Sequence, residues 1–114
     1  MTIYGRMGNK ALEKIVSEAL SGSGTRNLSS EGVEFLISYI AEKPYMLGRV
    51  EAKRIEPQYD RDMPNYSIYG HLPPSGEGFE TDRLEMIKLF RKLNVEAQNT
   101  ETYAMRYDVW LVEY

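Results

Sequence analysis

The spacing of apolar residues divides this 114-residue chain into segments with a helical period and segments with a strand period. From Leu12 to Leu20 the apolar positions follow the pattern i, i+3, i+4, i+7 and i+8, which predicts an amphipathic helix over residues 10–20. Asn9 is the expected N-cap, because its side-chain oxygen can accept a bond from an unpaired helix amide. The Ser-Gly-Ser-Gly run at 21–24 predicts the end of this helix, since glycine adopts the left-handed C-cap conformation at little cost.

Two further segments also have the helical period. The first is expected to start after Ser29 or Ser30 as the N-cap and to run to about residue 43, because Pro44 restricts the residue before it. The second covers residues 82–94, where Asp82 and the glutamate three residues later have the spacing of a capping box. Its broad apolar face predicts the most buried helix of the chain.

Strand-like alternation occurs after the second helix and again near the C-terminus. Residues 47–56 alternate imperfectly, and a bulge near Lys53 and Arg54 would restore their register. Residues 66–72 alternate cleanly after a loop at 57–64, and a second loop is expected at 73–78. Residues 95–101 and 103–113 are predicted as two more strands, and residues 2–6 as a short first strand. In the strand over 103–113, odd-numbered residues should face the core, and Asp108 is expected to be exposed on the other face.

This order of elements, (β)ααββαββ, predicts a single domain over residues 1–114. Two hairpins joined by a helical crossover give an α+β, two-layer fold. It consists of a mainly antiparallel sheet of four or five strands with three helices on one face. The other face is expected to be at least partly in contact with water.

Composition excludes several classes of function. The chain has no cysteine, so it has no disulfide, thiolate metal site or thiol nucleophile, which fits a reducing, cytoplasmic location. The N-terminus lacks the apolar region of a secretory signal, and no apolar run approaches the length of a membrane span. The formal net charge of −3 argues against non-specific binding of nucleic acid.

Few side chains suit catalysis or metal binding. His71 is the only histidine, and no orienting carboxylate or nucleophile adjoins it, so a surface position at the end of a strand is the favoured interpretation. A calcium-loop pattern beginning at Asp60 fails at Pro64, where a ligand is required. The glycine pair near residue 77 lacks the lysine of a phosphate loop and carries Glu77 instead. We therefore predict no metal, no cofactor and no catalytic residue, and a role other than that of an enzyme is favoured.

The nine tyrosines are the feature that points toward a function. Tyrosine, tryptophan and arginine are enriched at the energetic centres of protein interfaces, because they give a large contact area with little loss of rotamer freedom. About half of these rings are expected to be core or cross-strand partners. The predicted binding surface consists of Tyr59, Tyr66, Tyr69, His71, Arg49, Arg54, Arg106 and Trp110.

The leading hypothesis is a small cytosolic protein-binding module that acts as an inhibitor or adaptor by occupying a partner's surface. Its size and type also fit a phage-encoded inhibitor of a host protein. One alternative is a sheet that binds nucleic acid by base stacking, with Arg49, Arg54 and Arg106. Another is a small-molecule or enzymatic site formed by His71, Glu77 and Tyr69. A homodimer formed through an unpaired edge strand is a further alternative.

Overall fold

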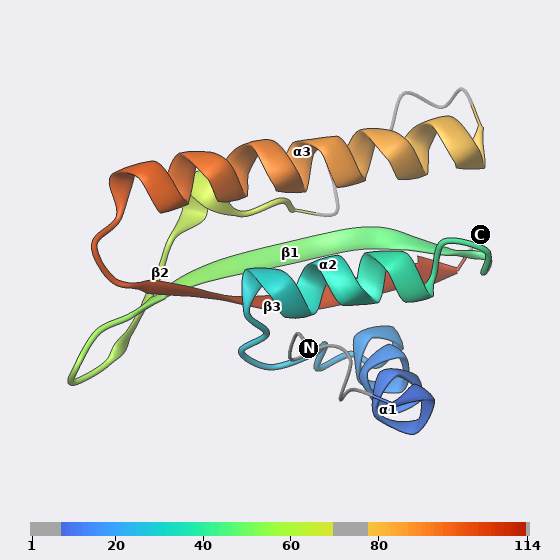
Figure 1. Cartoon of the computed structure of the whole chain (residues 1–114), viewed down its shortest axis with the longest axis horizontal. Helices are drawn as coiled ribbons and strands as arrows, with labels where there is room; N and C mark the ends of the chain where they lie inside the picture. The colour runs from blue at the N-terminus through green and yellow to red at the C-terminus, as the bar shows by residue number, and fades with distance from the viewer. Residues whose placement is uncertain (1–7, 70–77, 114) are drawn as a thin grey trace.

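A computed structural model describes residues 8–69 and 78–113 of the chain (Figure 1). Within these residues the fold is α+β, with three α-helices and one three-stranded antiparallel sheet, in agreement with the predicted class. The elements are α1 (Asn9–Leu20), α2 (Ser30–Tyr39), β1 (Tyr45–Ile55), β2 (Asp60–Asp62), the 3-10 helix η2 (Pro64–Tyr66), α3 (Phe79–Thr100) and β3 (Ala104–Glu113).

The long antiparallel pair of β1 and β3 is the centre of the sheet, whose strand order is β2-β1-β3. The register shifts between Leu47 and Arg49, so Gly48 is the additional residue of a bulge. A Cβ atom at Gly48 would lie 2.6 Å from Cγ1 of Val112, which explains why a glycine occupies this position. The bulge predicted near Lys53 and Arg54 was therefore placed at the wrong end of the strand.

The predicted four or five strands are not confirmed. Residues 95–100 belong to α3 and Glu101 is its C-cap, because Ala97 continues the buried face formed by Met86 and Phe90. The segment predicted as a strand over 66–72 begins inside η2, and among its described residues only Ile68 pairs with the sheet. The expected first strand, at 2–6, lies outside the described residues, as do residues 70–72 of the strand predicted over 66–72 and residues 73–77 of the second loop.

Short pieces of chain pair with both outer edges of the β1–β3 ribbon. Ile68 exchanges two backbone hydrogen bonds with Val50 of β1, at 2.7 and 2.8 Å. On the other edge, Leu28 exchanges bonds of 2.9 and 2.8 Å with Tyr107 of β3. The amide of Thr25 also donates to the carbonyl of Val109 at 3.0 Å. At Ile68 and at Leu28, single bridges and not full strands therefore pair with the edges of the ribbon.

The helix boundaries agree with the sequence in part. Ser29 is the N-cap of α2, and its Oγ accepts a bond from the amide of Gly32 at 3.1 Å, as predicted. Helix α1 begins at Asn9 itself, with Gly8 at the N-cap position. Helix α2 ends at Tyr39, four residues earlier than expected. Helix α3 begins at residue 79, so Asp82 lies buried in its first turn and is not its cap.

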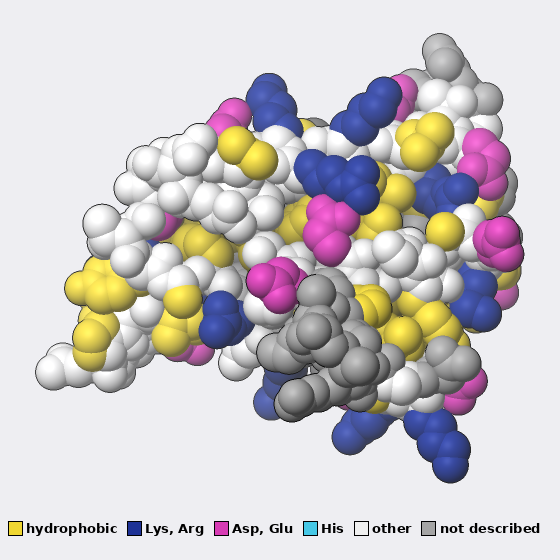
Figure 2. All heavy atoms as spheres, viewed as in Figure 1, with side chains coloured by type: hydrophobic (Ala, Val, Ile, Leu, Met, Phe, Trp, Pro, Cys, Tyr) yellow, Lys and Arg dark blue, Asp and Glu magenta, His cyan; other side chains and the backbone are white. Residues whose placement is uncertain are grey.

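Helices α2 and α3 lie on one face of the β1–β3 ribbon, and α1 runs beneath α2 against β3 (Figure 1). In the same view, hydrophobic side chains are visible between α3 and α2 (Figure 2). The odd-numbered residues of β3 face this core, as predicted. The ring of Phe90 from α3 meets that of Tyr107 edge-on, with the centroids 5.2 Å apart. The largest fully buried apolar and aromatic side chains are Tyr107, Phe90, Leu36, Ile40, Leu47, Ile68, Val33, Val50 and Val109.

Tyr107 gives a prediction for alkaline pH. Burial raises the pKa of its hydroxyl from 10.0 to about 12, and the hydroxyl donates to Oδ1 of Asn94 at 2.7 Å. Its contribution to stability is complete below the unfolded pKa of about 10 and is lost as the pH rises toward 12, because the unfolded chain releases this proton first. Between about pH 9.5 and 11.5, the wild-type free energy of unfolding should fall by about 1–2 kcal/mol more than that of Tyr107→Phe. Urea denaturation at several pH values measures this difference, and parallel curves for the two proteins would contradict it.

Candidate functional site

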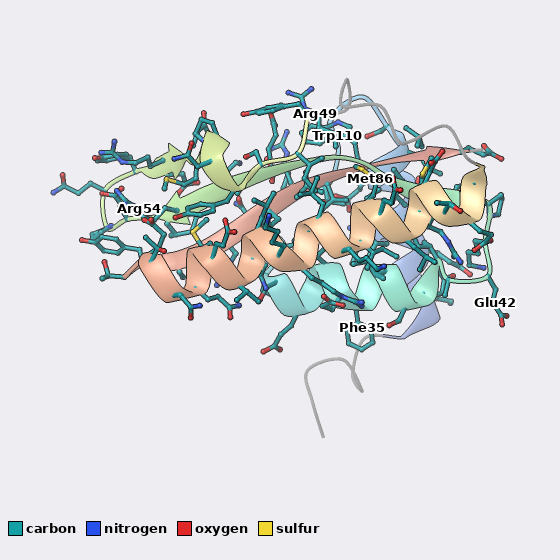
Figure 3. All side chains as sticks on the ribbon, turned by 90° about the horizontal axis from the view of Figure 1, so that it is seen from above. Phe35, Glu42, Arg49, Arg54, Met86 and Trp110 are labelled. Atoms are coloured by element: carbon teal, nitrogen blue, oxygen red, sulfur yellow. The ribbon has the colours of Figure 1, made fainter. Side chains whose placement is uncertain are left out.

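The face of the β1–β3 ribbon that points away from α2 and α3 carries three rungs of polar and aromatic side chains. Successive strand residues point to opposite faces, so these side chains alternate with the core residues Val50, Ala52 and Val109. Figure 3 shows Arg49 and Trp110 on the side of the strands away from α2. We call this surface the Arg49 face; it consists of the paired residues Arg49 and Trp110, Glu51 and Asp108, and Lys53 and Arg106, together with Tyr69.

The guanidinium group of Arg49 lies between two aromatic rings. Its Cζ is 4.9 Å from the centroid of Trp110 and 5.9 Å from that of Tyr69. Its Nη2 also donates to Oε1 of Glu51 at 2.6 Å. The Arg49 side chain is still 45% exposed, so the group is held in position while its edge remains accessible to a partner.

Trp110 is fixed in turn by the loop that follows α1. Its Nε1 donates to the carbonyl of Gly22 at 3.0 Å. Gly24 has a φ of 67° and lies directly against the indole, where a Cβ atom would be 2.5 Å from Cε2. A glycine is therefore required at position 24 both by the left-handed backbone and by the contact. The loop thus sets the position of the ring that supports Arg49.

Asp108 is a buried acceptor in the middle of the Arg49 face. Its Oδ2 lies 2.8 Å from Nζ of Lys53, and its Oδ1 accepts a bond from the amide of Asn27 at 2.9 Å. Asp108 is 9% exposed, so the prediction that it is exposed was wrong, although its face was predicted correctly. Asp108 is buried because the segment containing Asn27, which has a φ of 54°, folds over this end of the sheet.

A second group of charges lies at the other end of the ribbon, beyond the C-terminus of α3. Nη1 of Arg54 is 2.7 Å from Oε1 of Glu101, and its Nη2 is 2.7 Å from Oε2 of Glu56. The same oxygen of Glu56 also accepts from Nε of Arg61 at 2.9 Å. The hydroxyl of Tyr66 donates to Glu101 at 3.2 Å. We call these five residues the Arg54 network; the rings of Tyr103 and Tyr59 lie 5.6 Å and 5.3 Å from its two guanidinium groups.

The Arg54 network joins α3, the end of β1 and the loop that contains β2. Hydrogen bonds from Arg54 and then Arg61 lower the pKa of the Glu56 carboxyl from its ordinary 4.5. Hydrogen bonds to Glu56 and then Glu101 raise the pKa of Arg54. The side chains of Arg54, Glu56 and Glu101 are 11–23% exposed and that of Arg61 is 48% exposed, so the network is partly shielded from water and fixes the position of the loop against the end of α3.

The structure divides the predicted binding residues between these two groups. Arg49 lies against the rings of both Tyr69 and Trp110 on the Arg49 face. Arg106 lies on the same face, where its Nη1 donates to the carbonyl of Met105 at 2.8 Å. Tyr59, Tyr66 and Arg54 belong to or adjoin the Arg54 network, and His71 lies outside the described residues.

The sequence interpretation missed the carboxylates that pair with these arginines. Two of these pairs, Arg49 with Glu51 and Arg54 with Glu56, are two residues apart along or just beyond β1. Because side chains two residues apart in a strand point to the same face, the sequence alone indicates these pairings. The contacts of Glu101 and Asp108 join distant parts of the chain, and no local signal gives them.

Comparisons with protein-family models, curated proteins and solved structures gave no match. None of the described helices is long and apolar enough to cross a bilayer. In the same part of the chain, no three His, Cys, Asp or Glu side chains are grouped so that they could hold a metal ion. What the described residues do offer is a group of aromatic and charged side chains that their neighbours hold in position.

The Gly24 contact can be tested with a matched pair of glycines. Gly24→Ala should lower the free energy of unfolding by about 1–3 kcal/mol, because it adds backbone strain and a clash with Trp110. Gly22→Ala is the control, since a Cβ atom there would meet nothing within 4 Å. Urea denaturation gives both values, and emission from the single tryptophan should change only in Gly24→Ala. Equal stability of the two variants would contradict the contact.

The Arg54 network predicts an order of titration effects. Arg54→Gln should raise the pKa of Glu56 more than Arg61→Gln does, because the bond from Arg54 is the larger cause of its depression. Carbon-detected NMR titration of the glutamate carboxyls measures both shifts. The depressed pKa favours the folded state above about pH 4.5, and this effect is lost as the pH falls. Arg49→Gln should leave Glu56 unchanged, and the opposite order of the two arginine variants would refute the geometry.

Proposed function

We propose that this chain is a small protein-binding module that occupies a surface of its partner through the Arg49 face, as an inhibitor or adaptor does. The observation that carries this proposal is the guanidinium of Arg49, held between Trp110 and Tyr69 on a sheet face that α2 and α3 do not cover. Arginine, tryptophan and tyrosine are the residues most enriched at the energetic centres of protein interfaces.

Pre-organisation supports the proposal. Trp110 is held by the carbonyl of Gly22 and by contact with Gly24, and Arg49 is held by two rings and Glu51. Side chains that are already ordered lose little conformational entropy on binding, so more of the contact energy remains as affinity. A surface of this kind suits a protein that acts by covering a surface of its partner and not by catalysis.

The charges favour a protein over nucleic acid. On the Arg49 face the cations Arg49 and Lys53 are each paired with a carboxylate, Arg106 bonds to the carbonyl of Met105, and the whole chain has a net charge of −3. Phosphate backbones require an excess of accessible cations. A nucleobase would also have to displace Arg49 in order to stack on Trp110, whose ring already contacts Gly24.

The cellular location and the specific class of inhibitor that we propose rest on the sequence. The absence of cysteine favours action in the cytoplasm. The small size of the chain is typical of phage-encoded inhibitors of host proteins, and we propose that class as the specific form of the function. The alternative site around His71 is not proposed, because it falls on residues outside those described.

The experiment compares partner capture by matched variants. Tagged wild-type protein, Arg49→Ala and Lys92→Ala are each incubated with nuclease-treated lysate of the host cell, and retained proteins are quantified by mass spectrometry. Lys92 is exposed on α3, on the other side of the sheet, so Lys92→Ala is the control. A partner retained by the wild type and by Lys92→Ala should bind Arg49→Ala about tenfold more weakly or worse.

Two results would oppose the proposal. One is capture that is the same for Arg49→Ala as for the wild type, with circular dichroism showing all three proteins folded. The other is a partner that is captured from untreated lysate but not from nuclease-treated lysate, which would indicate that nucleic acid is the ligand.

A further inference from the structure

The chain between α1 and α2 follows the outer edge of β3, and one of its residues departs from a regular antiparallel ladder. We call residues 22–28 the connector. Its Leu28 exchanges backbone bonds with Tyr107. In a regular ladder the next such pair would join Arg26 to Val109, because bonded pairs recur every two residues. Thr25 takes this place instead, and its amide donates to the carbonyl of Val109 at 3.0 Å. The connector therefore contains one more residue than β3 between these two points.

The side chain of Thr25 completes the bonding of Val109. Its Oγ1 accepts a bond from the amide of Val109 at 2.9 Å, where a regular ladder would supply a backbone carbonyl. Thr25 is 1% exposed and Val109 is fully buried, so this bond is shielded from water. A buried amide without an acceptor destabilises the folded state. The hydroxyl of Thr25 is therefore needed to hold the connector in the observed register.

The bonds between Thr25 and Val109 adjoin the aromatic support of Arg49. Gly24, which precedes Thr25, lies directly against the indole of Trp110. Trp110 in turn follows Val109 in β3, and the centroid of its ring is 4.9 Å from Cζ of Arg49. A movement of Thr25 along β3 would therefore shift Gly24 relative to the ring that supports Arg49.

Apart from the bond of the indole itself to Gly22, the other described hydrogen bonds between the connector and β3 are farther from the ring. The amide of Asn27 donates to Oδ1 of Asp108 at 2.9 Å, and Leu28 pairs with β3 one residue beyond it. Both residues lie toward α2, and a φ of 54° at Asn27 turns the backbone between them and Gly24. Thr25 is thus the residue whose bonds hold the connector next to the indole.

We infer that Thr25 is a positioning residue of the Arg49 face, which fixes Arg49 through Gly24 and Trp110 without touching a partner. If the hydroxyl is removed, a carbonyl of the connector can reach the amide of Val109 only when the connector shifts along β3. That shift takes Gly24 away from the indole and loosens the guanidinium that the indole supports. The consequence for binding rests on the function proposed above, whereas the positioning itself does not.

The test compares Thr25→Val, Thr25→Ser and Ala97→Gly by NMR of the full chain. The two rings beside Arg49 displace the resonances of its side-chain protons, and Trp110→Ala sets the scale because it removes one ring. Thr25→Val should lose most of the displacement that Trp110→Ala loses, whereas Thr25→Ser keeps the hydroxyl and should retain it. Ala97→Gly lowers stability at a buried position of α3 without touching the connector, so it should also retain the displacement.

Three results would each overturn the inference. These are Arg49 resonances in Thr25→Val that match those of the wild type, an equal change in Ala97→Gly, or a loss of the displacement in Thr25→Ser. If Thr25→Val is unfolded, Thr25→Ala takes its place with the same expectation, because it removes the hydroxyl without placing a methyl group against the amide of Val109.

The capture assay then measures the consequence for binding. Thr25→Val should bind the partner about tenfold more weakly than the wild type, although its side chain is buried. If Arg49→Ala leaves capture unchanged, the proposed function fails, while the positioning is still decided by NMR without a partner. If Arg49→Ala weakens capture and Thr25→Val does not, the effect of Thr25 on binding is refuted and the proposed function stands.

Discussion

The pairing of β1 with β3 is the interaction on which the rest of the molecule depends. Ten residue pairs fix the register of the two strands, and the bulge at Gly48 sets which residues face which side from Arg49 onward. A slip of one residue would exchange the two faces, moving Val50 and Val109 into water and Arg49 and Trp110 into the core. The cost of burying those polar groups makes the observed register strongly preferred. The core and the candidate binding face are thus specified by the same pairing.

The fold class and several elements could be predicted from the sequence because their signals are local. The apolar stripe of α1, the capping of α2 by Ser29 and the alternation along β3 each need only neighbouring residues. The length of α3 was not predicted, because residues 95–100 have mixed composition and the burial of Ala97 in the core depends on the tertiary fold. Strand pairing at Ile68 is likewise set by Val50, eighteen residues away in the sequence.

The candidate site could be predicted less completely than the fold. Residue type alone selected Arg49, Tyr69 and Trp110 as candidates, and Arg49 lies against both rings. Residue type could not separate them from Arg54 and Tyr66, because that division depends on strand register and on where α3 ends. Asp108 illustrates the limit most clearly, since the amide that it accepts from belongs to Asn27, 81 residues earlier.

The short bridges on either side of the β1–β3 ribbon have a consequence for recognition. The outward backbone groups of Val50 are already hydrogen-bonded to Ile68, and those of Tyr107 to Leu28. The guanidinium of Arg106 donates a hydrogen bond to the carbonyl of Met105. An incoming strand would have to displace these contacts before it could extend the sheet at these positions. A partner that meets the ribbon there must therefore be recognised through side chains, so its identity is selected by shape and charge and not by the backbone pattern that every extended peptide shares.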